Sequence, residues 1–469
     1  ICSVQILLVF IEMECTNEFK EADSKPQYII ESKPLYAFQE KRRQIIKEIQ
    51  KTRREAILAE TRKLFIRNKQ KNDKSENPNE VEAKSTENPS ETVKGIDVLA
   101  DKMKELDLTN QKNIINNEEE TKKGPGAKTQ REKKTLRRNK QNHYAQQFTM
   151  PEWLVTVPMH LNEDLWYAMP KPEGIRALVI AESKKTVSRN KNGFIMQKFV
   201  SYLPGGWSLA DHDKTTVLDT IYVDSLKTYY VLDILFLKDA PVFQESTEIR
   251  QLILENHVFG ESKANLADFS EHNEFKFVLL PKRPCNSVVL QSCYNDSTPY
   301  AKDGILFYHK EAAYLSALHG TNPYILHWKD QFSSLYPFET EEGKEINDDV
   351  LAVLKVDVNN GLKTFDEVPV AEIDEKKKEN LELVTGNLIT VALKGMKLNE
   401  MAGSVQEGVR IDKAEPLKKP PVKKACADSL SKIIFQFQLR HKPLTYQELE
   451  MAIALNNKCK NTIFAGEKS

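Results

Sequence analysis

A series of short apolar, β-branched segments between positions 153 and 337 constrains the fold of this chain more than any other feature. The segments cover residues 177–181, 217–222, 229–237, 275–280 and 304–308. Turn-forming residues such as Asn192, Gly193 and the Pro-Gly-Gly run at 204–206 separate them. Short runs of this kind bounded by Gly, Pro and Asn are typical of β-strands. The pattern therefore predicts an α+β domain built on two antiparallel sheets.

The flanking regions are highly charged and contain few apolar residues. Charged residues make up 29% of the 469 residues, so we expect one folded domain with long tails. Residues 72–142 are rich in Asn, Glu, Lys, Ser and Thr, which predicts a disordered linker. Residues 339–469 are sparse in apolar residues and rich in lysine, so we expect a tail of low order. Two short helices are predicted within it, at 429–439 and at 446–455, the second opened by the capping box of Thr445 and Glu448.

Residues 34–71 contain many helix formers and no Gly or Pro after Pro34. Ile45, Ile49, Leu58 and Leu64 interrupt a field of Arg and Lys, which predicts a single basic helix. Its apolar stripe is thin, so the helix would gain order mainly by docking into an acidic partner. A solvated helix and an RNA-binding helix are the alternatives.

The six cysteines and the apolar start of the chain indicate neither a metal site nor a membrane anchor. The cysteines show no Cys-x-x-Cys spacing and no paired histidines, so we expect no zinc site, no disulfide framework and a reducing environment. Residues 4–11 are apolar but too few to span a bilayer, and they lack the basic flank of a signal peptide. Because the first methionine is Met13, we expect the opening residues to be a fragment end or a translated leader.

Three blocks of residues occur in an order that points to nucleotide binding. They are residues 171–176 (Lys-Pro-Glu-Gly-Ile-Arg), residues 229–236, and residues 303–310 with the following segment 325–329. In this order the blocks resemble the signature of the covalent nucleotidyltransferases, which include mRNA capping enzymes and polynucleotide ligases. The resemblance implies an mRNA-capping-enzyme or DNA-ligase-like nucleotidyltransferase fold.

Further segments narrow the resemblance. Residues 143–158, 202–206, 217–222, 275–278 and 303–310 resemble the snurportins, adaptors that recognise the 2,2,7-trimethylguanosine cap of spliceosomal small nuclear RNAs and bring their particles into the nucleus. The resemblance covers roughly residues 34–70 and 141–330. It implies a cap-binding domain at 143–338, shuttling between nucleus and cytoplasm, and no enzymatic activity, cofactor or metal.

The resemblance also implies which residues form the cap pocket. A 7-methylated guanine is cationic, so an indole face attracts it by stacking and by a cation–π interaction. Trp328 and Trp153 are the expected partners of the base, although each could instead pack in a core. Arg176 and Lys191 are expected at the phosphates, unless they are surface charges, and Lys171 and Gly174 complete the expected set.

A catalytic role for Lys171 is the first alternative. In guanylyltransferases the lysine of this block carries the nucleotide covalently, and such a nucleophile needs a lowered pKa. Glu173 replaces the aspartate of the enzymes, and Gln331 stands where we expect their second phosphate-contacting lysine, two positions after Lys329. We therefore expect no catalytic residue, and keep an RNA guanylyltransferase or ligase relative as the alternative. A general basic RNA-binding protein is the other alternative.

Two transport signals are expected outside this domain. The basic helix resembles the importin-β-binding helix of snurportin and importin α. It would dock through the basic residues Arg42, Arg43, Arg53, Arg54, Arg62 and Lys63. The spacing of Leu99, Met103, Leu106 and Leu108 fits a leucine-rich signal for an exportin, or else a local amphipathic turn.

Overall fold

The computed structural model describes residues 43–44, 144, 147–207, 214–260, 263–317, 320–338, 349–398, 409–418 and 426–466. The linker at 72–142 lies outside these residues, as does all of the predicted basic helix except Arg43 and Gln44. No helix among the described residues is both long enough and apolar enough to cross a membrane.

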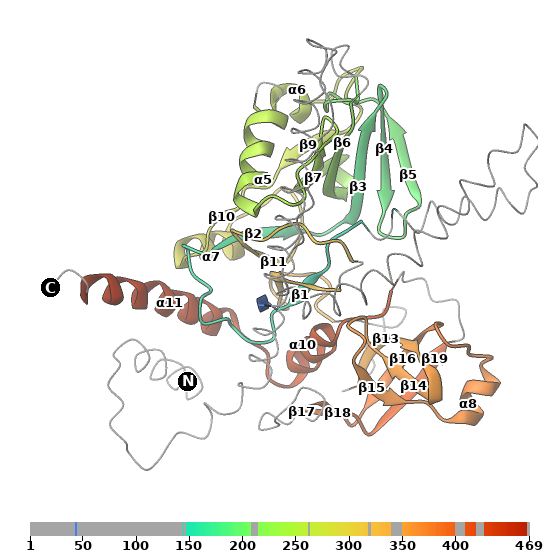
Figure 1. The fold of residues 1–469 in the computed structure, drawn as a ribbon. Helices are drawn as coiled ribbons and strands as arrows, with labels where there is room; N and C mark the ends of the chain where they lie inside the picture. Colours follow the sequence, from blue (N-terminus) through green and yellow to red (C-terminus); the bar gives the residue numbers. More distant parts are fainter. Residues whose placement is uncertain are drawn as a thin grey trace, which may run out of the picture. The chain divides into compact units, whose positions relative to one another are not determined.

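Two sheets form the strand-rich region, which is a mixed α+β structure as predicted (Figure 1). The larger sheet has the order β5-β4-β3-β6-β7-β8, with β9 beside β7. Its strands are β3 (Ile175–Glu182), β4 (Lys185–Asn190), β5 (Ile195–Phe199), β6 (Thr216–Val223), β7 (Thr228–Leu237), β8 (Ala240–Pro241) and β9 (Lys276–Leu279). The predicted segments at 177–181, 217–222, 229–237 and 275–280 therefore correspond to β3, β6, β7 and β9.

The second sheet has the order β1-β12-β11-β2-β10. Its strands are β1 (Pro151–Trp153), β2 (Trp166–Pro172), β10 (Arg283–Pro284), β11 (Lys302–His309) and β12 (Asn322–Trp328). Each sheet is antiparallel apart from one parallel pair, β7 with β9 in the first and β1 with β12 in the second. Met169, Ile221, Leu232, Leu306 and Ile325 pack together from strands of both sheets and form a core between them.

Short helices cover the sheets. They are α5 (Thr247–Ile253), a π-helical turn η4 (Leu254–Val258), α6 (Lys263–Ala267) and α7 (Ser287–Asn295), with a 3-10 turn η3 (Asp224–Leu226) between β6 and β7. The side chains of Ser246 and Asn286 cap α5 and α7. Each accepts a hydrogen bond from the backbone N–H of the residue three positions later. Figure 1 shows α5 and α6 along the larger sheet, where Leu254 and Leu266 enter its core.

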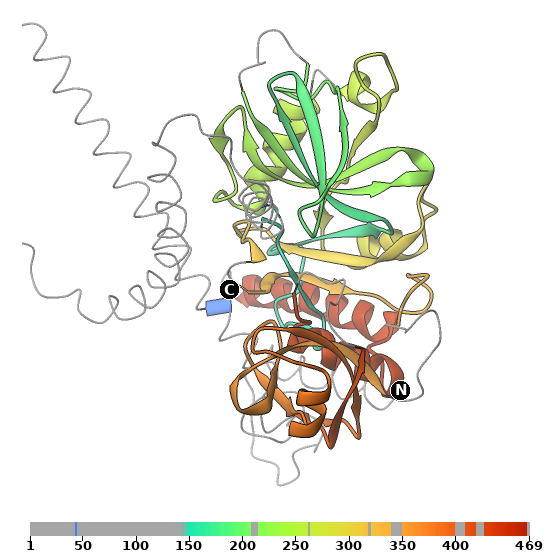
Figure 2. The ribbon, with the colours of Figure 1, turned by 90° about the vertical axis from the view of Figure 1, so that its right-hand side faces the viewer.

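Residues 349–418 contain a third sheet, which corrects the prediction of a low-order tail. It has the order β15-β14-β13-β16-β19, and Figure 2 shows it strongly curved. Its elements are β13 (Val350–Val356), η6 (Val358–Asn360), β14 (Gly361–Lys363), β15 (Pro369–Glu372), α8 (Glu375–Asn380), β16 (Leu388–Lys394) and β19 (Lys413–Lys418), beside a hairpin of β17 (Lys397–Leu398) and β18 (Val409–Arg410). The prediction failed because lysine-rich loops dominate the composition, whereas the apolar residues are concentrated in β13 and β16.

Helices α10 (Leu430–His441) and α11 (Tyr446–Gly466) confirm the two predicted C-terminal helices. The capping box is also confirmed, because the Thr445 backbone N–H donates to Glu448 at 2.9 Å and the Glu448 N–H donates to the Thr445 hydroxyl at 3.3 Å. Phe435, Leu449 and Ile453 pack in one core with residues of β11, β12 and α7. The helices are thus part of the core beneath the second sheet and not a tail.

Candidate functional site

A cavity lies between the two sheets of the strand-rich region. Its volume is about 40 Å³, and it is partly open to solvent. Its walls come from β1, β2, β3, β6, β7, β11 and β12 and the adjoining residues. The lining residues are Thr149, Pro151, Lys171, Gly174, Arg176, Ile221, Leu232, Leu306, Tyr308 and Ile325. Three of the predicted pocket residues, Lys171, Gly174 and Arg176, are therefore brought together here.

A charged cluster around Asp303 adjoins this cavity through Lys171. The carboxylate of Asp303 accepts hydrogen bonds from the ammonium groups of Lys171 and of Lys329, the latter at 3.0 Å, and from the Ser334 hydroxyl at 2.7 Å. One carboxylate thus holds two lysines that come from different strands, β2 and the end of β12. His327 lies on the same side of β12, with its Nε2 2.8 Å from the carbonyl oxygen of Asp303.

The protonation states of this cluster follow from burial and from the ion pairs. Burial lowers the pKa of Lys171, and the charge of Asp303 partly offsets that effect. Burial alone would raise the pKa of Asp303, but Lys171, His327 and Lys329 outweigh it and hold the pKa well below its ordinary value. Burial lowers the pKa of His327 to about 3, so its imidazole is neutral at neutral pH. Burial, followed by the charge of Asp303, raises the pKa of Glu173 on the neighbouring turn.

Two glycines near the charged cluster allow neighbouring backbone segments to lie in close contact. A Cβ atom on Gly174 would lie 2.5 Å from the carbonyl oxygen of Tyr222, so only glycine lets the turn after β2 pack on β6. Gly304 has a φ of +84°, and a Cβ there would lie 2.2 Å from the carbonyl oxygen of Trp328. Glycine at 304 therefore lets Asp303 reach the end of β12.

Arg176 is committed to a buried ion pair. Its guanidinium binds both carboxylate oxygens of Asp219, at 2.9 Å and 2.5 Å. The Tyr314 hydroxyl donates to the same carboxylate at 2.8 Å. The structure therefore places Arg176 at the cavity, with its charge already matched by a fully buried aspartate. Its predicted role at the phosphates stays a prediction.

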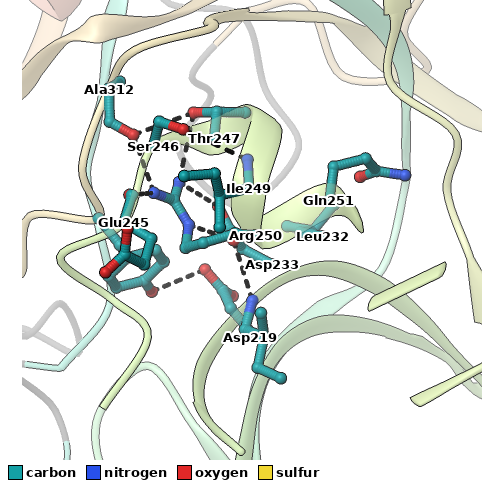
Figure 3. A network of polar contacts seen from close by, with 12 residues as sticks. Asp219, Leu232, Asp233, Glu245, Ser246, Thr247, Ile249, Arg250, Gln251 and Ala312 are labelled. Carbon is teal, nitrogen blue, oxygen red and sulfur yellow. Dashed lines mark hydrogen bonds and ion pairs between the residues drawn. The ribbon is translucent and has the colours of Figure 1, made fainter. Parts of the chain in front are cut away.

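A second buried network braces the wall formed by β7 (Figure 3). Arg250 of α5 pairs with Asp233 through two hydrogen bonds of 2.7 Å and 2.9 Å, and it also donates to the carbonyl oxygens of Glu245 and Ala312. Lys282 donates to the carbonyl oxygen of Leu232 at 2.5 Å. These bonds fix α5 and β7 to each other, so the adjoining wall of the cavity is held by groups that are themselves paired.

The structure does not bring Trp328 to the cavity. Its side chain is 0% exposed, and its indole N–H donates to the carbonyl oxygen of Leu444 at 3.0 Å. Since neighbouring residues of a strand point to opposite faces, Trp328 points away from His327 and into the core that contains Phe435 and Leu449. A covered indole has no free face for a base, so this position does not support the predicted stacking role.

The other predicted residues lie in different surroundings. Trp153 packs between His327 and Phe435, with ring centroids at 4.5 Å and 4.7 Å, and the Lys329 ammonium lies 5.6 Å from its ring. It therefore adjoins the charged cluster without lining the cavity. Lys191 is exposed on the turn between β4 and β5 and does not line the cavity either.

Sequence reasoning missed Asp303, His327 and Lys329 as site residues, although all three lie in the quoted blocks. The expectation placed a second lysine at position 331, two residues after Lys329. Gln331 is exposed on the turn beyond β12. His327, two residues before Lys329, lies on the same face of the chain as Lys329. Position 327 carries a neutral imidazole, so it adds no second cation beside Lys329.

Of the predicted importin contacts, only Arg43 is described. It is 4% exposed, its Nε donates to the carbonyl oxygen of Pro323 at 3.3 Å, and its own carbonyl oxygen accepts from the Tyr324 hydroxyl at 2.8 Å. Its side chain is therefore not presented to a partner here. The other five basic residues and the export-signal candidate lie outside the described residues.

Comparison with known protein families gives a match within the strand-rich region. The family model described as "Snurportin1, m3G cap-binding domain" matches residues 147–329. This segment is similar to the m3G cap-binding domain of Snurportin1. The match includes β1, the cavity walls and β12 with Lys329, so the cavity and most of the charged cluster belong to the matched domain.

Solved structures of DNA ligases are similar only at a low level. A mycobacterial DNA ligase D complexed with ATP and MES is 13% identical, with 59% of this chain and 97% of that chain covered and a TM-score of 0.27. A Lig E DNA ligase is 14% identical, with 58% and 98% covered and a TM-score of 0.26. The ligase domain of LigD from M. tuberculosis is 13% identical, with 60% and 99% covered and a TM-score of 0.26. At such scores the likeness carries no conclusion about activity.

Proposed function

We propose that this chain is a nuclear import adaptor that binds the 2,2,7-trimethylguanosine cap of spliceosomal small nuclear RNA. The observation that carries the proposal is the match of residues 147–329 to the m3G cap-binding domain. The cap-binding site is the cavity between the two sheets together with the adjoining cluster of Lys171, Asp303 and Lys329. The order of the three sequence blocks and the two facing sheets support a nucleotidyltransferase-like fold for this domain.

The lysine cluster suits the polyphosphate bridge of a cap. Each ammonium group has three N–H donors. Asp303 occupies one donor of Lys171, whereas Asp303 and the carbonyl oxygen of Tyr336 occupy two donors of Lys329. The remaining donors can make charge-assisted hydrogen bonds to phosphate oxygens, which are among the stronger hydrogen bonds in proteins. Asp303 orders the two side chains in advance, so less conformational entropy is lost when the ligand binds.

The lowered pKa of Lys171 is the one observation that favours the enzyme alternative, because a nucleophilic lysine must be deprotonated. However, Lys171 is paired with Asp303, whose depressed pKa shows that the carboxylate is charged and favours a charged partner. His327, which is neutral, supplies no second cation from the position two residues before Lys329. We therefore propose a binding site without nucleotidyl transfer. Incubation with labelled GTP and magnesium tests this, and a covalent adduct that survives denaturation and disappears in Lys171→Ala would refute it.

The transport partners are proposed from the sequence. Residues 34–71 would bind importin β, and residues 99–108 would bind an exportin when the adaptor returns from the nucleus. A chain lacking residues 1–75 should then bind capped RNA normally but fail to bring it into nuclei. Reversal of charge at Arg53 and Arg54 should weaken importin β binding most at low salt.

The direct test of the function is the affinity for a trimethylated cap analogue, a monomethylated one and uncapped RNA of the same sequence, each measured over a range of salt concentrations. We expect the trimethylated cap to bind most tightly. Lys329→Ala should weaken cap binding and flatten its salt dependence, because one ammonium group is lost from the site. Lys191→Ala is the matched control, since Lys191 is exposed on a turn outside the cavity, and it should behave as the wild type. Equal affinity for capped and uncapped RNA would favour the general RNA-binding alternative.

A further inference from the structure

Helix α10 packs against the edge strand β1 at Trp153 (Figure 1). In the sheet as described, β1 neighbours β12 alone, and the Leu154 N–H donates to the carbonyl oxygen of His327 at 2.9 Å. On the opposite side of the strand, the Trp153 N–H donates to the Ser431 hydroxyl of α10 at 3.2 Å. An edge strand leaves backbone donors without a partner in the sheet, so Ser431 satisfies the donor that a further strand would otherwise pair.

The Trp153 side chain lies between β12 and α10. Its ring centre is 4.5 Å from that of His327 in β12 and 4.7 Å from that of Phe435 in α10, with an interplanar angle of 40° in each pair. Ser431 and Phe435 are four residues apart, so one face of α10 supplies both the hydrogen bond and the aromatic contact. Both residues are buried, whereas Trp153 is half-buried and keeps part of its surface open.

The third sheet fixes α10 in this position. Asp428, two residues before the helix, accepts the Val353 N–H of β13 at 2.8 Å. Ile433, on the other face of α10, is 1% exposed and packs in the core of the third sheet. The position of the Trp153 indole therefore depends on the region from β13 to α10, which lies outside the segment matched to the cap-binding domain.

Trp153 is also the more accessible of the two tryptophans expected at the cap base. Trp328 is 0% exposed under α10 and α11, whereas Trp153 adjoins the proposed phosphate site, since the Lys329 ammonium lies 5.6 Å from its ring. A cationic base is attracted by the face of an indole and not by its edge, so this attraction depends on the orientation of the ring.

We propose that α10 contributes to the cap site without touching the cap: Ser431 and Phe435 are positioning residues that set the orientation of Trp153, and through it the preference for a trimethylated over a monomethylated cap. The inference rests on the proposed cap-binding function and adds a region that the matched domain does not contain. A ring held between two others presents its open surface in one orientation, so less conformational entropy is lost on binding. The two additional methyl groups make short-range contacts, so a small rotation of the indole weakens binding of the trimethylated cap most.

The test is the substitution Phe435→Leu in the full chain, which removes the ring and keeps an apolar side chain. The ratio of the affinities for trimethylated and monomethylated cap analogues should fall at least threefold. In protein labelled with 5-fluorotryptophan, the fluorine resonance of Trp153, assigned from its absence in Trp153→Phe, should move before any ligand is added. Ile433→Val is the matched control, because Ile433 is buried on the same helix but faces the third sheet, so the affinity ratio and the resonance should stay as in the wild type.

A double-mutant cycle separates positioning from general destabilisation. Trp153→Phe should lower the affinity ratio, and Phe435→Leu should lower it no further in that background. Ser431→Ala should change the ratio in the same direction as Phe435→Leu, because it removes the hydroxyl that accepts the Trp153 N–H.

Four results would each overturn the proposal: a wild-type ratio in Phe435→Leu, a wild-type ratio in Trp153→Phe, a full further loss when the two are combined, or a Trp153 resonance that does not move. Failure of the wild type to bind the cap, or equal affinity of the wild type for both caps, would instead overturn the proposed function. The two failures can therefore be told apart.

Discussion

Replacement of Trp328 by alanine separates the role implied by the family resemblance from the role that the structure shows. A stacking platform on the rim of a pocket could be removed with little loss of stability. Trp328, however, is 0% exposed and packs in a core with Phe435 and Leu449. Its removal should leave a cavity in that core. It should also remove the indole N–H that donates to the carbonyl oxygen of Leu444 at 3.0 Å.

The expected loss can be stated from these contacts. Truncation of a buried aromatic residue to alanine costs about 3–5 kcal/mol, and loss of the hydrogen bond adds about 1 kcal/mol. A total of about 4–6 kcal/mol is a large part of the roughly 5–15 kcal/mol by which native proteins are stable. We therefore expect Trp328→Ala to be largely unfolded or to unfold at a much lower denaturant concentration.

The assay is urea denaturation followed by far-UV circular dichroism, which does not depend on tryptophan fluorescence. Trp207→Ala is the control, because Trp207 is 39% exposed and stacks on His272 at the surface, so its removal should cost less than about 1 kcal/mol. Trp328→Phe should lie between the two. If Trp328→Ala keeps the wild-type midpoint and loses only cap affinity, Trp328 is the stacking platform and the structural reasoning is refuted.

Three further outcomes are expected. A chain that ends before α10 should fail to unfold cooperatively, because Phe435, Leu449 and Ile453 complete the core under the second sheet; preserved cap affinity in that chain would contradict this. Asp233→Asn should lower the unfolding free energy by about 3–5 kcal/mol in denaturant titrations, since it leaves the fully buried Arg250 without its charge partner. The stability of the wild type should fall as the pH drops from about 6.5 toward about 3, because unfolded His327 takes up a proton that the folded protein resists. That part of the pH dependence should be absent from unfolding curves of His327→Gln.

Much of the first domain could be predicted because its central strands carry their own pattern. β3, β6, β7 and β11 are apolar and β-branched along most of their length, and each was expected within a few residues. β2 was missed because Pro170, Lys171 and Pro172 interrupt its apolar residues. Local propensity disfavours this strand, and pairing with β11 imposes it.

The third sheet and the function of the C-terminal helices could not be predicted in the same way. Lysine-rich and glutamate-rich loops dominate the composition of the curved sheet at 349–418. Its two apolar strands, β13 and β16, therefore do not stand out in the sequence. The helices α10 and α11 were expected, but the surface that they cover was not, because their partners on β12 and α7 lie more than 100 residues earlier in the chain. Long-range packing of this kind leaves no local signal.

The same distinction explains the site. Lys171, Gly174 and Arg176 are contiguous, so the sequence could place them together, but it could not show which cation is already paired. Arg176 faces Asp219 one to one in a buried, bidentate ion pair, whereas Lys171 and Lys329 share the single carboxylate of Asp303. An anionic ligand competes poorly for a matched guanidinium and more easily for two ammonium groups that retain free donors. At the proposed cap site we therefore expect the phosphates to bind the lysines, while Arg176 stays paired with Asp219 in the cavity wall.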